Sequence, residues 1–347
     1  VAAGKLFNTI FGLPYFESLL IGAFVVVFYT FLGGFSAVAL TDLIQGTMMF
    51  FTVLYVPVAA AIALGGPAPT MDILAKEGPD FFSFFPDSTG MGALAIMMVS
   101  SLGWGLGYFG QPHILVKFMA ISDAKDLKKS THIAMTWVIL SLAFAIAMGV
   151  IGKAYLTTPL ENANAERVFV LMAESLSAPF ITGIIWSAIL AAIMSTSSSQ
   201  LLVTSSAVSR DLFQAFLCKD ASEKTLIRVS RISVLLVSCI AVYLGSDPNS
   251  YIFSIVSYAW AGFGACFGGT VLLSLYWKRM TLKGAYAGVI VGGLTVLIWK
   301  QFAWFDLYEL VPGFFFSVIA IIVVSLMDKE PSESIKKTFE KALALSK

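Results

Sequence analysis

Nine apolar stretches, each about as long as a bilayer is thick, constrain this chain more than any other feature. A helix needs about 20 mostly apolar residues to cross the hydrocarbon core, where every backbone polar group must find an internal partner. The sequence shows no recurring ten-residue alternation, so we do not expect transmembrane strands. We predict an all-α polytopic membrane protein with about nine transmembrane helices, at roughly 17–37, 43–65, 92–111, 133–156, 178–206, 228–246, 250–277, 283–300 and 311–327.

The composition excludes two broad classes of protein. Charged residues make up 12% of the chain and the mean hydropathy is +0.86, whereas a soluble domain carries about 25% charged residues. A net charge of +1 provides no basic field for nucleic acid. The three cysteines and two histidines (Cys218, Cys239, Cys266, His113, His132) show no spacing typical of disulfides or metal sites. We therefore expect neither a soluble enzyme nor a bound cofactor.

The basic residues predict how the chain is oriented in the membrane. With nine spans, 17 of the 22 Lys and Arg residues fall on one side, in 117–131, 210–231, 278–283 and the tail after Asp328. Basic loops face the cytoplasm, so we expect a cytoplasmic C-terminus, with 66–91 and 157–177 outside. The tail, residues 328–347, is expected to be a short cytoplasmic helix or disordered. The chain begins at Val1 without Met, and we expect it to be part of a longer protein.

A glycine-rich segment interrupts the third apolar stretch. Residues 101–112 contain four glycines and end in Pro112, and both residue types weaken a helix. In lipid such a break is tolerated where the freed backbone groups face protein or a water-filled cavity, as at transporter binding sites. Trp104 and Tyr108, four residues apart, would present aromatic surface there. The alternative is a glycine-rich packing face with aromatic residues at the membrane interface.

Five consecutive hydroxyl residues, Ser195 to Ser199, lie inside the fifth apolar stretch. Hard cations prefer oxygen ligands, and hydroxyls with backbone carbonyls supply oxygen without burying a charge. The competing interpretation is that these hydroxyls bond back to their own helix. Neither a serine-nucleophile motif nor a suitably placed histidine accompanies them, so we do not expect catalysis.

Two acidic residues and a third aromatic segment are further candidates. Asp42 lies between the first two spans, and we favour an N-cap there, which is compatible with a gating contact. Glu166 lies in the external loop 157–177, either over the entrance or as a solvated charge paired with Arg167. Residues 257–269 alternate small and aromatic side chains, which fits either a thin gate or helix packing.

These segments together resemble the sodium/solute symporter family, and within it the sodium/proline symporters. The resemblance covers essentially the whole chain. It is carried by Gly33-Gly34-Phe35 with Thr41-Asp42, by Gly103 to Ile114, by Asn164 to Phe169, by Ser187 to Gln200, by Ser257 to Gly264, and by Tyr308 to Gly313. Two departures are Lys117, where the family usually has Arg, and Gly268-Gly269, which replaces Gly-Pro.

The resemblance implies a fold and a transport activity. The fold would be an inverted five-plus-five helix core with peripheral helices, of which residues 1–327 lack the first three core helices. The activity would be Na⁺-coupled uptake of L-proline across the inner (plasma) membrane by alternating access. Trp104, Tyr108 and Pro112 would bind the substrate.

The resemblance also implies which residues serve the coupling ion. Ala192, through its carbonyl, would bind Na⁺ with Ser195 and Thr196. Asp42 and Glu166 match positions linked to coupling and external gating. Na⁺ would be the coupling ion and not a cofactor.

Three alternatives to proline symport remain open at this stage. The first is a symporter for another small amino or carboxylic acid, since close substrates differ by little binding energy. The second is a transporter-like sensor domain, which the short tail disfavours. The third is a membrane-embedded enzyme, which would need clustered His, Asp or Glu at one membrane face.

Overall fold

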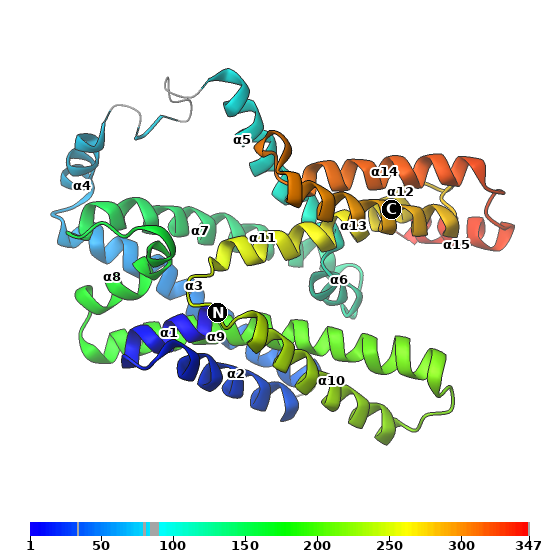
Figure 1. The fold of residues 1–347 in the computed structure, drawn as a ribbon, viewed down its shortest axis with the longest axis horizontal. Coiled ribbons are helices and arrows are strands. Elements are labelled where there is room, and N and C mark those ends of the chain that lie inside the picture. Colours follow the sequence, from blue (N-terminus) through cyan, green and yellow to red (C-terminus); the bar gives the residue numbers. More distant parts are fainter. Residues whose placement is uncertain (33–34, 79–80, 84–89, 346–347) are drawn as a thin grey trace. The chain divides into compact units, whose positions relative to one another are not determined.

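The computed structural model describes residues 1–32, 35–78, 81–83 and 90–345. This part of the chain is helical and divides into two compact units (Figure 1). The first unit comprises residues 1–83 and 121–252, and the second comprises 84–120 and 253–347. The predicted segment Gly33-Gly34 lies outside the described residues.

The first unit is built from long apolar helices and short connecting ones. Gly12, with a φ of 65°, ends α1, and the chain turns by 118° into α2. The helices are α1 (Ala2–Phe11), α2 (Tyr15–Leu32), α3 (Phe35–Ala63), α4 (Pro67–Leu74), η1 (Ala75–Glu77), α7 (Asp126–Tyr155), η3 (Asn162–Arg167), α8 (Val168–Leu176), α9 (Pro179–Ser206), its π-helical continuation η4 (Ala207–Leu217), and α10 (Glu223–Leu244).

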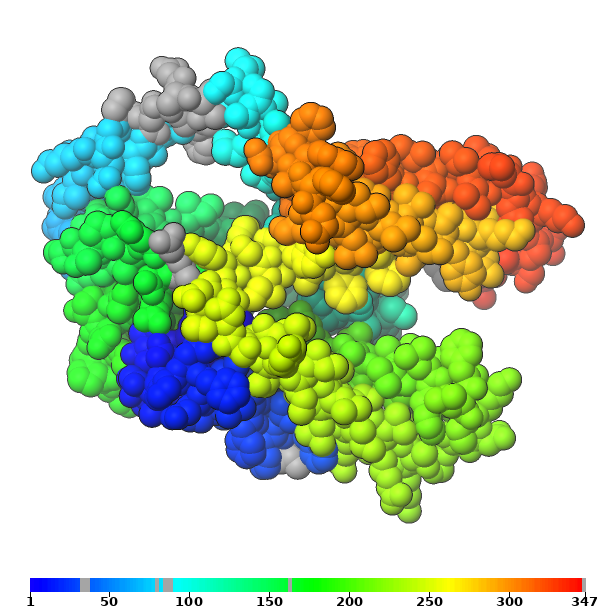
Figure 2. Space-filling model, in the orientation of Figure 1, coloured from blue at the N-terminus to red at the C-terminus, as the bar shows by residue number. Residues whose placement is uncertain are grey.

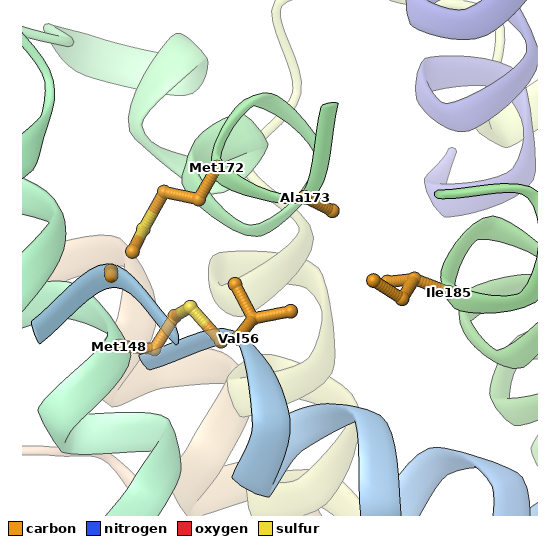
Figure 3. Packing of buried hydrophobic residues seen from close by; sticks show 6 residues of the cluster. Val56, Met148, Met172, Ala173 and Ile185 are labelled. Carbon is orange, nitrogen blue, oxygen red and sulfur yellow. The ribbon is translucent and has the colours of Figure 1, made fainter. Parts of the chain in front are cut away.

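Four helices of the first unit share a buried apolar cluster. Val56 of α3, Met148 of α7, Met172 of α8 and Ile185 of α9 are each at most 5% exposed. Figure 3 shows the side chains of Val56, Met148 and Met172 converging, with Ile185 directed toward them from α9. Burial of this kind contributes about 1.5–3 kcal/mol per large side chain in water. The cluster therefore fixes α8, which follows the loop containing Glu166, onto the long helices.

The second unit contains the interrupted third span and the C-terminal helices. Pro112 occupies the first turn of α6, where its missing N–H costs no helical hydrogen bond. The elements are α5 (Met91–Gly103), η2 (Trp104–Gly110), α6 (Pro112–Met119), α11 (Ile252–Phe263), the π-helical η5 (Gly264–Gly268), α12 (Gly269–Tyr276), α13 (Leu282–Phe302), η6 (Trp304–Asp306), α14 (Leu310–Met327) and α15 (Glu333–Leu345).

A row of glycines lets α13 pack closely in this unit. Gly284, Gly288 and Gly292 lie four residues apart and are all buried. A Cβ atom at Gly288 would lie 2.3 Å from a side-chain carbon of Ile321 on α14, and one at Gly292 would lie 2.2 Å from the Ala265 carbonyl oxygen. Small residues at this spacing are how membrane helices bring their backbones together.

The predicted transmembrane helices agree with the structure in number and place. Among the described residues, eight helices are long and apolar enough to cross a membrane, and the bent pair α1–α2 makes nine if it is one span. The protein is therefore a multi-pass membrane protein.

The structure bears on three local expectations and overturns one of them. The segments 66–91 and 157–177, which we expected to lie outside, contain the helices α4 and α8, respectively. The favoured capping role of Asp42 is wrong, because α3 begins at Phe35 and places Asp42 inside the helix. The tail is helical, and α15 is linked to the connection before α13 by an ion pair between Lys278 and Glu340.

Gly292→Ala is expected to destabilise the second unit by about 1–3 kcal/mol, because the added methyl group meets backbone atoms that have no rotamer to adopt. Gly149→Ala is the matched control. Gly149 lies within α7, where an added Cβ has nothing within 4 Å. Thermal unfolding of the purified protein in detergent measures both variants. Equal midpoints for the two variants would contradict the close packing at Gly292.

Acidification is expected to release α15. A hydrogen bond from Lys278, in the connection before α13, holds the pKa of Glu340 on α15 below its ordinary range. A carboxylate whose pKa is lowered by docking stabilises the docked state above its ordinary pKa, and this contribution is lost as the pH falls through the lowered value. Spin labels on α15 and on the 277–281 connection should therefore move apart below about pH 4. A distance unchanged at that pH would show that apolar contacts hold α15.

Candidate functional site

The predicted break in the third span is confirmed. Helix α5 ends at Gly103, and Trp104–Gly110 continues as a 3₁₀ segment. Gln111 then takes an extended conformation (φ −83°, ψ 112°) before α6 begins at Pro112. The break leaves backbone carbonyls without regular helical partners, so these carbonyls must accept hydrogen bonds from elsewhere in the protein.

Two side chains donate hydrogen bonds to backbone carbonyls of η2. The indole nitrogen of Trp260 on α11 donates to the carbonyl of Trp104 at 3.0 Å. The buried amide of Gln111 donates to the carbonyls of Gly107 and Trp260, both at 3.2 Å. A Cβ on Gly107 would lie 2.0 Å from the Trp260 indole nitrogen, so glycine is needed for α11 to come this close. The broken segment is thus held in a defined shape by α11.

The predicted substrate residues Trp104 and Tyr108 lie in an aromatic cluster. The Trp104 ring stacks with Phe253, Trp260 and Tyr308, at centroid distances of 5.6, 5.4 and 6.0 Å. Tyr108 meets Trp260 edge to face at 4.9 Å and stays 44% exposed.

Part of this cluster was not predicted. Trp260 lies in the segment 257–269, for which gate and packing were equal alternatives, and in this structure it packs on η2. Sequence reasoning did not select Phe253 or Tyr308 as site residues, because only the packing of α11 and the α13–α14 connection brings them to Trp104. The hydroxyl of Tyr308 donates to the Ser257 carbonyl at 2.7 Å, which fixes this connection on α11.

The predicted sodium residues lie on one face of α9. Ala192, Ser195 and Thr196 are spaced i, i+3 and i+4 in an uninterrupted helix, so the Ala192 carbonyl and the two hydroxyls share one turn. A helical carbonyl keeps a second lone pair for a cation. Ala192 and Ser195 are half-buried and Thr196 is exposed. These oxygens can supply one side of a cation site.

The competing prediction, that the hydroxyls of 195–199 donate hydrogen bonds to carbonyls of their own helix, is confirmed for one of them. Ser198 donates to the Ser195 carbonyl at 3.1 Å. Ser199 instead donates to the carboxylate of Asp42 on α3 at 3.2 Å, and Ser199 is itself buried. The structure thus joins two features that the sequence presented separately, the acidic residue of α3 and the hydroxyl run of α9.

Glu166 is not the solvated charge of the simpler interpretation. Its carboxylate lies 2.7 Å from the ammonium of Lys5 on α1, and the two side chains are 19% and 8% exposed. Arg167, the neighbour considered as its partner, donates to the Asn8 side chain at 2.9 Å. The η3 segment, which carries Glu166, is therefore bound to α1.

The predicted site residues fall into both compact units. Trp104, Tyr108 and Pro112 belong to the second unit, and Ala192, Ser195 and Thr196 belong to the first. Within the described part of the chain, no group of three or more His, Cys, Asp or Glu residues could hold a metal ion.

Trp260→Phe is expected to lower the free energy of unfolding by about 0.5–1.5 kcal/mol more than the same change at a tryptophan without a hydrogen bond, since both changes shrink the ring but only this one loses the bond to the Trp104 carbonyl. Trp186→Phe is the matched control, because the buried indole nitrogen of Trp186 has no hydrogen-bond partner among the described residues. Thermal unfolding in detergent compares the two. An equal shift for both variants would mean that the Trp260 bond does not stabilise η2.

Comparison with known proteins agrees with this architecture. The profile of the sodium:solute symporter family matches residues 1–292. The chain is 46% identical over 347 residues to a sodium/proline symporter of Escherichia coli (strain K12), covering 99% of this chain and 68% of that protein. It is also 46% identical to an osmoregulated proline transporter of Bacillus subtilis (strain 168), covering 98% of this chain and 69% of the relative.

A solved structure shares the fold. A Na⁺-coupled sialic acid symporter, captured in a substrate-bound outward-open state, superposes with a TM-score of 0.76 at 18% identity, covering 96% of this chain and 71% of its own. The broken span, the long apolar helices and the family match agree with one another. The chain belongs to the sodium:solute symporter family.

Proposed function

We propose that the protein containing this chain carries out Na⁺-coupled uptake of L-proline by alternating access. The observation that carries the proposal is the 46% identity, over 99% of the chain, to a sodium/proline symporter. The fold alone does not select the substrate, because the solved structure with the same fold is a sialic acid symporter.

In this proposal the broken span binds proline. Trp104 and Tyr108 offer aromatic faces to the pyrrolidine ring, and such faces also attract its secondary ammonium group. Pro112 starts α6 and so keeps the break in place. Trp260 and Gln111 act indirectly, because they hold the η2 backbone in shape.

Na⁺ binds at α9 in the same proposal. The Ala192 carbonyl and the hydroxyls of Ser195 and Thr196 supply neutral oxygen ligands, as a hard cation prefers. The Ser199–Asp42 hydrogen bond links the same run to α3, which supports a coupling role for Asp42. Because Na⁺ and proline each favour the outward-open state, each should raise the affinity for the other by the same factor.

The orientation follows the distribution of basic residues. We place the protein in the plasma membrane with its C-terminus in the cytoplasm. Residues 1–327 then form the transmembrane symporter domain and residues 328–347 the cytoplasmic tail. Helix α14 ends at Met327, which supports that boundary. Glu166 lies outside and serves external gating.

Uptake of labelled proline into proteoliposomes tests the proposal, with the protein containing this chain at its full natural length. An inward Na⁺ gradient should drive uptake, and K⁺ in its place should not. Ser195→Ala with Thr196→Ala should raise the half-saturating Na⁺ concentration by about tenfold or more, since two oxygen ligands are lost. Ser187→Ala is the matched control on the same helix, because its hydroxyl bonds only back to Gly183 among the described residues.

Other outcomes separate the alternatives. Sodium-independent proline uptake would leave a transporter and overturn the assignment of Ser195 and Thr196. Uptake of another amino or carboxylic acid in place of proline would keep the coupling mechanism and change the substrate. Ligand binding without any transport would favour the sensor.

A further inference from the structure

The segment from Tyr308 to Gly313 carries part of the family resemblance but has no role in the proposed function. Tyr308 lies in the connection between α13 and α14, and its ring stacks on Trp104 at a centroid distance of 6.0 Å. Its hydroxyl donates to the Ser257 carbonyl at 2.7 Å, and its backbone N–H donates to the Ser100 hydroxyl at 3.1 Å. Tyr308 thus touches α5, η2 and α11 at once, and Figure 2 shows the orange surface of the connection against the cyan surface of α5.

The backbone of this connection is strained. Ala303, Phe305 and Asp306 have φ angles of 44°, 62° and 53°, in the left-handed region that residues other than glycine rarely adopt. Such conformations persist only where the surrounding structure holds them, and they gather at functional sites. Here the indole nitrogen of Trp299 on α13 donates to the Leu307 carbonyl at 3.2 Å. The connection therefore has a defined shape, which fixes where Tyr308 begins.

A buried carboxylate anchors the end of the connection. The side chain of Glu309, the residue before α14, is 9% exposed, and its carboxylate lies 3.4 Å from the ammonium of Lys300 on α13. This contact joins two charges without an aligned hydrogen bond, since Glu309 Oε1 has no hydrogen-bond partner among the described residues. A buried charge needs a counter-charge, and the N-terminus of α14 also favours a negative group. Both effects hold Glu309, and with it the neighbouring Tyr308, in place.

Stacking sets the plane of the Trp104 indole. The rings of Phe253, Trp260 and Tyr308 lie within 11°, 14° and 16° of that plane, respectively. The first two rings come from α11, whereas Tyr308 comes from the α13–α14 connection. A side chain already held in its binding orientation loses less freedom when a ligand arrives, so the ligand binds more tightly.

We infer that Tyr308 is a positioning residue for substrate binding, which acts by holding the indole plane of Trp104, and that Glu309 keeps Tyr308 in place through Lys300. The substrate site then depends on the helix pair α13–α14 as well as on η2 and α11. This inference rests on the proposed function for the role of Trp104 and for the identity of the ligand, whereas the stacking contact does not.

The affinity for proline tests the positioning role in the protein at its full natural length. Tyr308→Leu removes the ring and should raise the half-saturating proline concentration for uptake about three- to tenfold, with the maximal rate nearly unchanged. Tyr308→Phe keeps the ring and should lie between this variant and the parent. Tyr286→Leu, at a tyrosine of α13 that is 61% exposed, is the matched control. A lower maximal rate with an unchanged half-saturating concentration in Tyr308→Leu would show a structural role alone and overturn the inference.

A double variant tests whether Tyr308 acts through Trp104. In a Trp104→Leu background, adding Tyr308→Leu should change the half-saturating proline concentration by less than about twofold, because the ring that Tyr308 positions is already absent. A further increase as large as that in the parent background would mean that Tyr308 acts independently of Trp104, and it would overturn the positioning role.

Fluorine NMR of the protein labelled with fluorotryptophan, in detergent and without substrate, gives a readout independent of transport. Trp104→Phe assigns the Trp104 resonance, because that variant lacks it. Tyr308→Leu and Glu309→Gln should each move or broaden this resonance, since the first removes the stacked ring and the second its anchor, whereas Tyr286→Leu should not.

The two readouts separate the inference from the proposed function. An unmoved Trp104 resonance in Tyr308→Leu overturns the role of Tyr308, and an unmoved resonance in Glu309→Gln overturns that of Glu309. If the resonance responds as expected but the unsubstituted protein shows no Na⁺-driven proline uptake, the proposed function fails and the positioning of Trp104 stands.

Discussion

Pairing of backbone polar groups inside the membrane is the constraint on which this structure depends. In a regular α-helix the backbone carbonyls accept hydrogen bonds from N–H groups of the same helix. The third span departs from this pattern between Gly103 and Pro112. Trp260 and Gln111 restore partners for the carbonyls of Trp104 and Gly107. The break is tolerated because α11 approaches closely enough to bond it, and glycine at position 107 permits that approach.

The buried charged side chains also need partners. Within the described residues of the first unit, each of the two acidic side chains singled out in the sequence meets a partner from a distant segment, Asp42 on Ser199 and Glu166 on Lys5. Burying a charge is costly unless it is paired and hydrogen-bonded, so these contacts couple the helices that carry them. Helix α9, which carries the hydroxyl run, packs beside α3, and the η3 segment is bound to α1. Movements of these helices relative to one another must therefore break or exchange these polar contacts.

The fold and the substrate rest on different evidence. A sialic acid symporter and this chain share their architecture at 18% identity, so the helix arrangement is compatible with unlike substrates. In this chain, η2 and α11 carry the aromatic cluster around Trp104. Aromatic faces suit a small cyclic amino acid, and sequence identity to proline transporters points the same way.

The sequence by itself determined the helical membrane fold, the break at 103–112 and the hydroxyl run on α9, because hydrophobic length, glycine and proline content and helical spacing act locally. The family resemblance, since confirmed, supplied the roles of Trp104, Tyr108, Pro112, Ala192, Ser195 and Thr196, and these roles stay predictions. Only the tertiary structure placed Asp42 inside α3 and paired Lys5 with Glu166. It alone brought Phe253 and Tyr308 to Trp104. These contacts join residues more than 140 positions apart, and no local pattern encodes which distant partner a buried charge or ring will meet.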